Sequence, residues 1–97
     1  MRRDEAIDQL AAHLSDIRSQ FHVESLAIFG SVARDEAKSQ SDVDILVSYV
    51  KTPGLVGFLA LKEYLETLLG APVDLVTSRA LKRQLRESIE RESIRVH

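Results

Sequence analysis

The spacing of hydrophobic residues changes several times along the 97-residue chain, and each change marks an expected element. Over 3–20, apolar residues recur at every third or fourth position, which predicts an amphipathic helix. Its apolar stripe consists of Ala6, Ile7, Leu10, Ala11, Leu14 and Ile17. Segment 23–29 ends instead in four consecutive apolar residues, a pattern typical of a strand covered on both faces. The chain is therefore expected to open with a helix and a buried strand.

A second strand is predicted over 42–50, where polar and apolar residues alternate at the start. Alternate side chains of a strand point to the same face, so Val43, Ile45 and Val47 should share the face that packs on the core. The loop before this strand is short. We therefore expect the strand to pair antiparallel with the segment 23–29.

The rest of the chain predicts a helix, a strand and a helix. Segment 55–69 has a wide apolar stripe and is followed by Gly70, where a C-cap glycine is typical. Segment 72–77 is rich in residues that favour strands, and over 78–92 leucine and isoleucine recur at every fourth position. These elements indicate an α/β (α+β) fold with a small mixed sheet of three to four strands and flanking helices.

The C-terminal part leaves two questions open. Its helix carries basic side chains that could meet an acidic partner or RNA, or that could simply form a solvated face balanced by glutamates. They are Arg79, Lys82, Arg83 and Arg86. Segment 93–97 could be a frayed end or a tail that binds a partner.

Composition narrows the class of protein. Hydrophobic residues make up 44% and charged residues 29% of the chain, which is ordinary for a globular protein, and without cysteine there are no disulfides. A net charge of −2 gives no basic field, so direct nucleic-acid binding is not expected. The longest apolar run, 54–61, is too short to cross a membrane, and the N-terminus carries acids where an export signal is apolar. We expect one domain over 1–97, located in the cytoplasm.

The first candidate for chemistry is the pair Gly30-Ser31, which ends the strand 23–29. Ser31 is expected to be the N-cap of a short helix over 32–37. A strand that ends in such a turn leaves backbone N–H groups free, and these can bind an anion such as a phosphate. A plain strand-to-helix turn is the alternative.

The second candidate is a set of acidic residues. Asp42 and Asp44 alternate with apolar residues, so their side chains should project side by side from Cα atoms about 6.5–7 Å apart. Such close like charges resist joint ionisation unless a cation lies between them, which indicates a divalent-metal site. Asp74 interrupts the apolar strand 72–77 and could join them on one face. Alternatively, it could be a solvent-facing edge residue or a salt-bridge partner.

Together these residues suit metal-assisted nucleotidyl transfer. Mg²⁺ takes one or two carboxylates and completes its shell with phosphate oxygens and water, and two such ions can clamp a displacement at phosphorus. Asp42 and Asp44 could bridge both ions, while Asp74 would hold the ion nearest the acceptor and could act as general base. The Ser31 hydroxyl and the nearby amides would hold the β and γ phosphates.

The combined motif reads G-S-x-x-R…S-D-x-D-x-x-V and consists of Gly30, Ser31, Arg34, Ser41, Asp42, Asp44 and Val47. It resembles the minimal nucleotidyltransferase (MNT) family of the DNA polymerase beta superfamily, whose pattern is Gly-Ser, about ten residues, Asp-x-Asp and a later acid on another strand. Here ten residues separate Ser31 from Asp42, and Asp74 stands in the context of the later acid. The resemblance implies the DNA polymerase beta-like nucleotidyltransferase fold.

The resemblance also implies roles for individual residues. Asp42, Asp44 and Asp74 would be the catalytic metal ligands. Gly30, Ser31, Arg34 and Ser41 would bind the nucleotide phosphates, although Arg34 could equally form a structural ion pair with an acid. Members of the family often have glycine where this chain has Asp35, and if that position requires a positive φ, the aspartate would be mildly strained.

Proteins of this kind resemble the antitoxins of HEPN–MNT (type VII) toxin–antitoxin systems. The resemblance implies an Mg²⁺-dependent enzyme that transfers AMP from ATP to a tyrosine of a cognate HEPN ribonuclease toxin, alone or as a homo-oligomer or hetero-oligomer with the toxin. A 97-residue chain has little surface for its own acceptor pocket, which favours a docked macromolecular acceptor. Two alternatives remain: an antitoxin that only occludes its partner, and a nucleotidyltransferase that acts on a small molecule or nucleic acid with a partner subunit.

Overall fold

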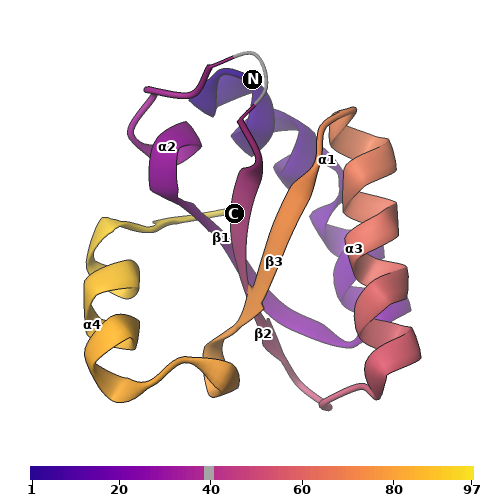
Figure 1. Ribbon diagram of the computed structural model, residues 1–97. Coiled ribbons are helices and arrows are strands. Elements are labelled where there is room, and N and C mark those ends of the chain that lie inside the picture. The colour runs from indigo at the N-terminus through magenta and orange to yellow at the C-terminus, as the bar shows by residue number, and fades with distance from the viewer. Residues whose placement is uncertain (39–40) are drawn as a thin grey trace.

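The computed structural model describes residues 1–38 and 41–97 and has a four-stranded sheet between helices (Figure 1). The elements in chain order are α1 (Arg3–Phe21), β1 (Val23–Phe29), α2 (Gly30–Ala33), β2 (Val43–Tyr49), α3 (Leu55–Leu69), β3 (Val73–Thr77), a 3₁₀ turn (Ser78–Ala80), α4 (Arg83–Glu92) and β4 (Ile94–Arg95). The expected mixed α/β fold is therefore confirmed. Within the described ranges, no helix has the length and apolar character needed to cross a membrane.

The strands lie in the order β3-β2-β1-β4. The neighbours β1 and β2 are antiparallel, as the short connection predicted, and β4 is antiparallel to β1. Helix α3 carries the chain back along the sheet, so β3 is parallel to β2. In this register Asp44 lies opposite Asp74 on one side and opposite Phe29 on the other. The ends of three strands thus meet at one edge of the sheet.

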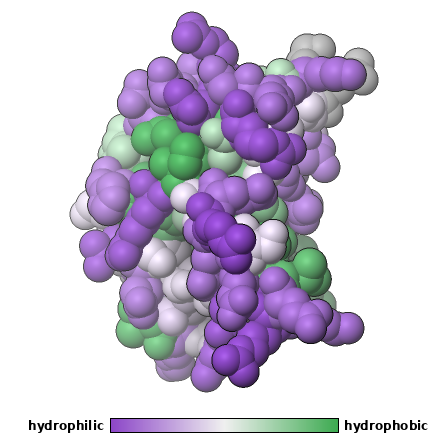
Figure 2. All heavy atoms as spheres, turned by 90° about the vertical axis from the view of Figure 1, so that its left-hand side faces the viewer, coloured by the Kyte–Doolittle hydropathy of each residue, from purple (hydrophilic) through white to green (hydrophobic). Residues whose placement is uncertain are grey.

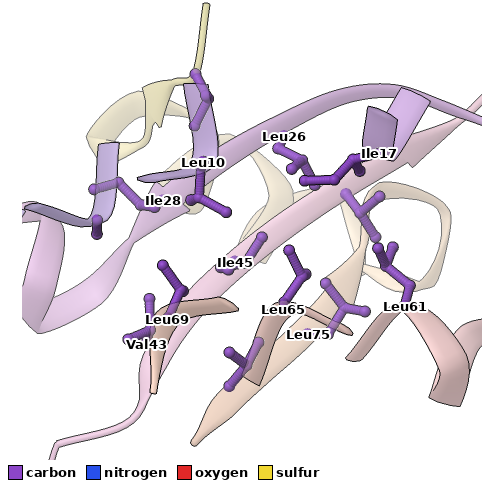
Figure 3. Packing of buried hydrophobic residues seen from close by; sticks show 14 of the residues in the cluster. Leu10, Ile17, Leu26, Ile28, Val43, Ile45, Leu61, Leu65, Leu69 and Leu75 are labelled. Carbon is purple, nitrogen blue, oxygen red and sulfur yellow. The ribbon is translucent and has the colours of Figure 1, made fainter. Parts of the chain in front are cut away.

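The main core lies between one face of the sheet and the helices α1 and α3 (Figures 1 and 3). The side chains of Val43, Ile45 and Val47 are fully buried there, as the alternation in the sequence predicted. Leu10 and Ile17 of α1 reach the same core, which Figure 3 shows together with the leucines of α3. This packing fixes β2 and directs its intervening side chains to the opposite face.

The opposite face carries a smaller apolar cluster under α4. Its buried members are Ala27, Phe29 and Leu46, and partly buried Leu81 and Ile89 pack against them. Figure 1 shows α4 on the other side of the sheet from α1 and α3. Part of this face therefore stays free of a covering helix, and Asp44 and Asp74 emerge on it.

The predicted helix over 78–92 was wrong in its first turns. The chain forms a 3₁₀ turn over Ser78–Ala80, in which the Ala80 N–H donates to Thr77 Oγ1 (3.2 Å), and then becomes extended at Lys82. Helix α4 begins only at Arg83. The Thr77 side chain competes with helical hydrogen bonds at this point, as threonine hydroxyls commonly do.

The C-terminal tail is an edge strand. Ile94 pairs with Ile28, the Val96 N–H donates to the Leu26 carbonyl (2.9 Å), and the Val96 side chain is buried. The interpretation of 93–97 as a frayed end is therefore wrong. Anchoring by β4 also fixes where α4 ends, at Glu92 beside the start of α2.

Candidate active site

The turn at Gly30 lies directly against Asp44. Gly30 has a φ of +69°, and a Cβ built on it would collide with the Asp44 carboxylate. Only glycine avoids both the strained dihedral and the collision. The sequence prediction that the Gly-Ser turn and the acidic strand meet at one place is thus confirmed by the geometry.

The short helix after the turn differs from the prediction. Helix α2 covers Gly30–Ala33, its N-cap is Phe29, and Ser31 lies inside it, so the expected N-cap role of Ser31 over 32–37 was wrong. The helix ends early because Asp35 has a φ of +59°, the left-handed value that the family's glycine at this position suggested. The Asp35 carboxylate accepts a hydrogen bond from the Arg3 N–H (3.2 Å), which ties this turn to α1.

Asp44 and Asp74 form the centre of the acidic set. They lie opposite one another on parallel strands, close enough for Asp74 to act on the pKa of Asp44. The pKa of Asp44 is raised above its ordinary value of 3.8. The causes are burial, then the charge and hydrogen bond of Asp74, then the charge of Asp42, while Arg34 offsets part of the rise. Two neighbouring carboxylates that repel each other in this way suit a hard divalent cation, which prefers oxygen ligands.

Asp42 takes a more peripheral position. It precedes β2 and is exposed, yet it is near enough to raise the pKa of Asp44. In the described ranges 1–38 and 41–97, no three acidic or histidine side chains are close enough to form a ready-made metal cluster. The structure thus brings Asp44 and Asp74 together and leaves Asp42 at the edge of the pair.

Arg34 and Ser41 both have protein partners. Arg34 Nε forms an ion pair with Glu36 Oε2 (3.1 Å), and its Nη1 lies 3.6 Å from Glu92 Oε2. This arrangement matches the ion-pair alternative, and the positive charge of Arg34 also partly offsets the rise in the pKa of Asp44. Ser41 Oγ accepts a hydrogen bond from the Lys38 N–H (2.9 Å), so its hydroxyl belongs to the loop.

One residue at the site was missed by sequence reasoning. The Gly30 N–H donates to Glu92 Oε1 (3.3 Å), so the last residue of α4 contacts the Gly30 turn. In the sequence, Glu92 is one of several acids on a helix expected to be solvated. Only the pairing of β4 with β1 brings it here, and a two-residue strand has no periodicity that could reveal this.

The raised pKa of Asp44 predicts a dependence of stability on pH. Between the ordinary carboxyl pKa and the raised one, the unfolded chain binds fewer protons than the folded chain, so stability falls as pH rises through this window. At neutral pH Asp44 is ionised in both states, and the full cost of ionising it in the folded chain is subtracted from the stability. Asp44→Asn should therefore raise the melting temperature at pH 7.5, and the gain should shrink as pH approaches 4. Melting curves in EDTA would test this, with Asp16→Asn on the exposed side of α1 as control. A gain that does not change with pH would contradict the prediction.

A glycine turn packed against one of two facing carboxylates, on a mixed sheet with this strand order, is the arrangement expected of a nucleotide-transferring enzyme. Residues 8–97 match the family described as the nucleotidyltransferase domain. The protein adenylyltransferase MntA of Thermococcus cleftensis is 46% identical over 87 residues, which are 90% of this chain and 88% of that protein. The chain therefore belongs to the nucleotidyltransferase domain family and is a nucleotidyltransferase.

Solved structures agree with this assignment. One, assigned as a minimal nucleotidyltransferase, has a TM-score of 0.82 at 35% identity, and the match covers 97% of this chain and 95% of that chain. Another, of a tri-AMPylated HEPN toxin from Shewanella oneidensis in complex with an MNT antitoxin, has a TM-score of 0.68 at 18% identity, over 94% of this chain and 71% of that one. The second shows a common fold. The expected MNT resemblance and fold are thus confirmed.

Proposed function

We propose that this protein is an antitoxin that transfers AMP from ATP to a tyrosine of a cognate HEPN-type toxin and thereby neutralises it. The observation that carries the proposal is the contact of the Gly30 turn with the Asp44–Asp74 pair, which supports binding of a nucleoside triphosphate beside an acidic metal site. The identity of 46% with a protein adenylyltransferase supports AMP as the transferred group and a protein as its acceptor.

The residues of the site have distinct roles in this proposal. Asp44 and Asp74 would hold Mg²⁺, with Asp42 as a further ligand, because carboxylate oxygens are the donors that this cation prefers. When bound, one or two Mg²⁺ ions would supply charge neutralisation at the phosphates and a lowered pKa for the attacking hydroxyl. Asp74 is exposed at the open face and could accept the proton of the acceptor hydroxyl.

The Gly30 turn is the part of the site that would hold the phosphates of ATP. The backbone amides at Gly30 and Ser31 would donate to phosphate oxygens, and the Arg34 guanidinium would neutralise their charge. The fold holds the Gly30 amide and the Arg34 guanidinium in place before ATP binds, but both contact the Glu92 carboxylate, so a phosphate has to displace that carboxylate and not the donors themselves. A direct role of Ser41 in phosphate binding would require its hydroxyl to leave the Lys38 amide.

The acceptor comes from a docked protein in this proposal. A hollow of about 490 Å³ lies between α1 and α3, lined in part by Phe21, Tyr64 and Leu68. That is the face of the sheet opposite to Asp44, so this hollow cannot present an acceptor to the site. An open acidic edge suits a tyrosine that a partner inserts. We infer a cytoplasmic location for this reaction, because ATP is available there.

The test is incubation of the protein with α-labelled ATP, Mg²⁺ and the HEPN-type protein encoded beside it. We expect the partner to gain the mass of one or more AMP units on tyrosine and to lose its ribonuclease activity. Neutralisation without any mass gain would favour an antitoxin that only occludes its partner. Label found only on a small molecule or RNA would favour a nucleotidyltransferase that acts on such an acceptor with a partner subunit. Either result would contradict the proposal.

A further inference from the structure

The carboxylate of Glu92 bridges two groups of the proposed phosphate site. Its Oε1 accepts the hydrogen bond of the Gly30 N–H at 3.3 Å, and its Oε2 lies 3.6 Å from Arg34 Nη1. Each oxygen thus contacts one cationic or N–H donor. Glu36 is also an acid beside Arg34, at 3.1 Å, but the structure gives it no contact with the Gly30 amide.

The chain on both sides of Glu92 holds it in place. Helix α4 ends there, and the Ser93 hydroxyl donates to the Glu90 carbonyl (2.9 Å) at that end. Strand β4 begins two residues later and pairs with β1, and Val96 is buried. Figure 1 shows this path, in which the yellow end of the chain returns from α4 to the sheet. The fold therefore positions the Glu92 carboxylate at the Gly30 turn.

Carboxylate and phosphate oxygens are recognised by the same chemistry. Both are anionic acceptors for backbone N–H groups and for guanidinium, and hydrogen bonds to either are stronger than those between neutral groups. The single N–H of Gly30 points at one acceptor at a time. A phosphate oxygen on this amide would therefore have to replace Glu92 Oε1.

We propose that Glu92 competes with a nucleotide phosphate for the Gly30 amide and the Arg34 guanidinium, and so weakens the binding of ATP. The inference rests on the proposed function, because that function assigns these two donors to phosphate. The Arg34–Glu92 pair is about half exposed, so water can replace either partner at low cost. The surface around α4 is predominantly hydrophilic, as Figure 2 shows, and offers the released carboxylate a solvated position. Glu92 then lowers the affinity of the site for ATP without preventing ATP from binding.

The test is calorimetric titration of the full chain with ATP and Mg²⁺, for wild type, Glu92→Gln, Glu36→Gln and Glu90→Gln. Glu36→Gln removes the same charge beside Arg34 without touching the Gly30 amide, and Glu90→Gln removes a charge one half-turn away on α4. We expect Glu92→Gln to bind ATP about 3- to 10-fold more tightly, since one charged hydrogen bond and one exposed ion pair no longer oppose binding. Both controls should stay within about twofold of wild type.

Kinetics separate competition from positioning. In the AMP-transfer assay, Glu92→Gln should lower KM for ATP by a similar factor and leave kcat unchanged. Equal ATP binding by Glu92→Gln would overturn the inference, because Glu92 would then not compete with the nucleotide. Weaker binding would also overturn it, because Glu92 would then orient Arg34 for the nucleotide. An equal gain in Glu36→Gln would also overturn it, since general charge would then be the cause. If wild type and all three variants bind no ATP, the proposed function itself fails.

Discussion

Asp44→Asn should reduce AMP transfer by about 10³-fold, the scale seen when one key electrostatic group is removed from an active site. Asp44 is the best-placed acid of the site, because it lies opposite Asp74, against the Gly30 turn and within range of the Asp42 charge. Its replacement leaves a neutral amide of nearly the same shape. The fold should persist, so the loss would be chemical.

The measurement is the initial rate of label transfer to the partner protein at saturating ATP, with melting curves to confirm folding. Asp16→Asn, an exposed acid on α1, is the matched control and should retain full activity. Asp74→Asn should resemble Asp44→Asn, whereas the more peripheral Asp42 should give an equal or smaller loss. Retention of wild-type rates by Asp44→Asn would show that the acidic pair does not carry the reaction.

Gly30→Ala should abolish nucleotide binding and destabilise the fold. The new Cβ would collide with the Asp44 carboxylate and would force alanine to a φ of +69°, so the turn or the acid must move. A strained backbone of this kind costs about 1–3 kcal/mol, and displacement of Asp44 would add to that cost. The free energy of unfolding in urea and calorimetry with ATP and Mg²⁺ would give the two effects.

Two other glycines separate the causes. Gly70 has a similar φ of +65°, but apart from its chain neighbours no atom of the described residues lies within 4 Å of the position that a Cβ would take, so Gly70→Ala reports the dihedral alone. Gly54 has neither a positive φ nor a close neighbour, and Gly54→Ala should change stability by less than about 1 kcal/mol. Both variants should bind nucleotide normally. If Gly30→Ala binds ATP as wild type does, the turn is not the phosphate site.

The elements with strong periodicity were predictable from sequence, and the meeting of the acids they carry was one of the alternatives that it offered. The period of two in β2 set Asp44 opposite to the core face, and the helical connection α3 required a parallel β3. Together these rules allowed Asp74 to join Asp44 on one face, and the register of β2 and β3 shows the two residues opposite one another. Gly70 was predictable as a C-cap because a positive φ ends α3 there. Each of these features depends on local chemistry or on one simple connection.

What could not be predicted depends on contacts that are distant in sequence. Strand β4 has only two residues, which is too short for a recognisable sequence pattern. It forms because its backbone pairs with β1. The position of Glu92 follows from that pairing. The N-cap prediction for Ser31 failed because Gly30 already adopts the helical hydrogen-bond pattern, and Arg34 N–H donates to its carbonyl (3.1 Å). Ser41 matched a motif, yet its hydroxyl is bound to Lys38.

The central claim is that Asp44 and Asp74 bind a divalent cation beside nucleotide phosphates on the Gly30 turn. Its most direct test is a crystal structure with Mn²⁺ and a non-hydrolysable ATP analogue, in which the anomalous signal of Mn²⁺ marks the cation. We predict an anomalous peak in contact with the carboxylates of Asp44 and Asp74 and a phosphate on the Gly30 amide. A nucleotide bound elsewhere, or no anomalous peak at this pair with the analogue bound, would contradict the account.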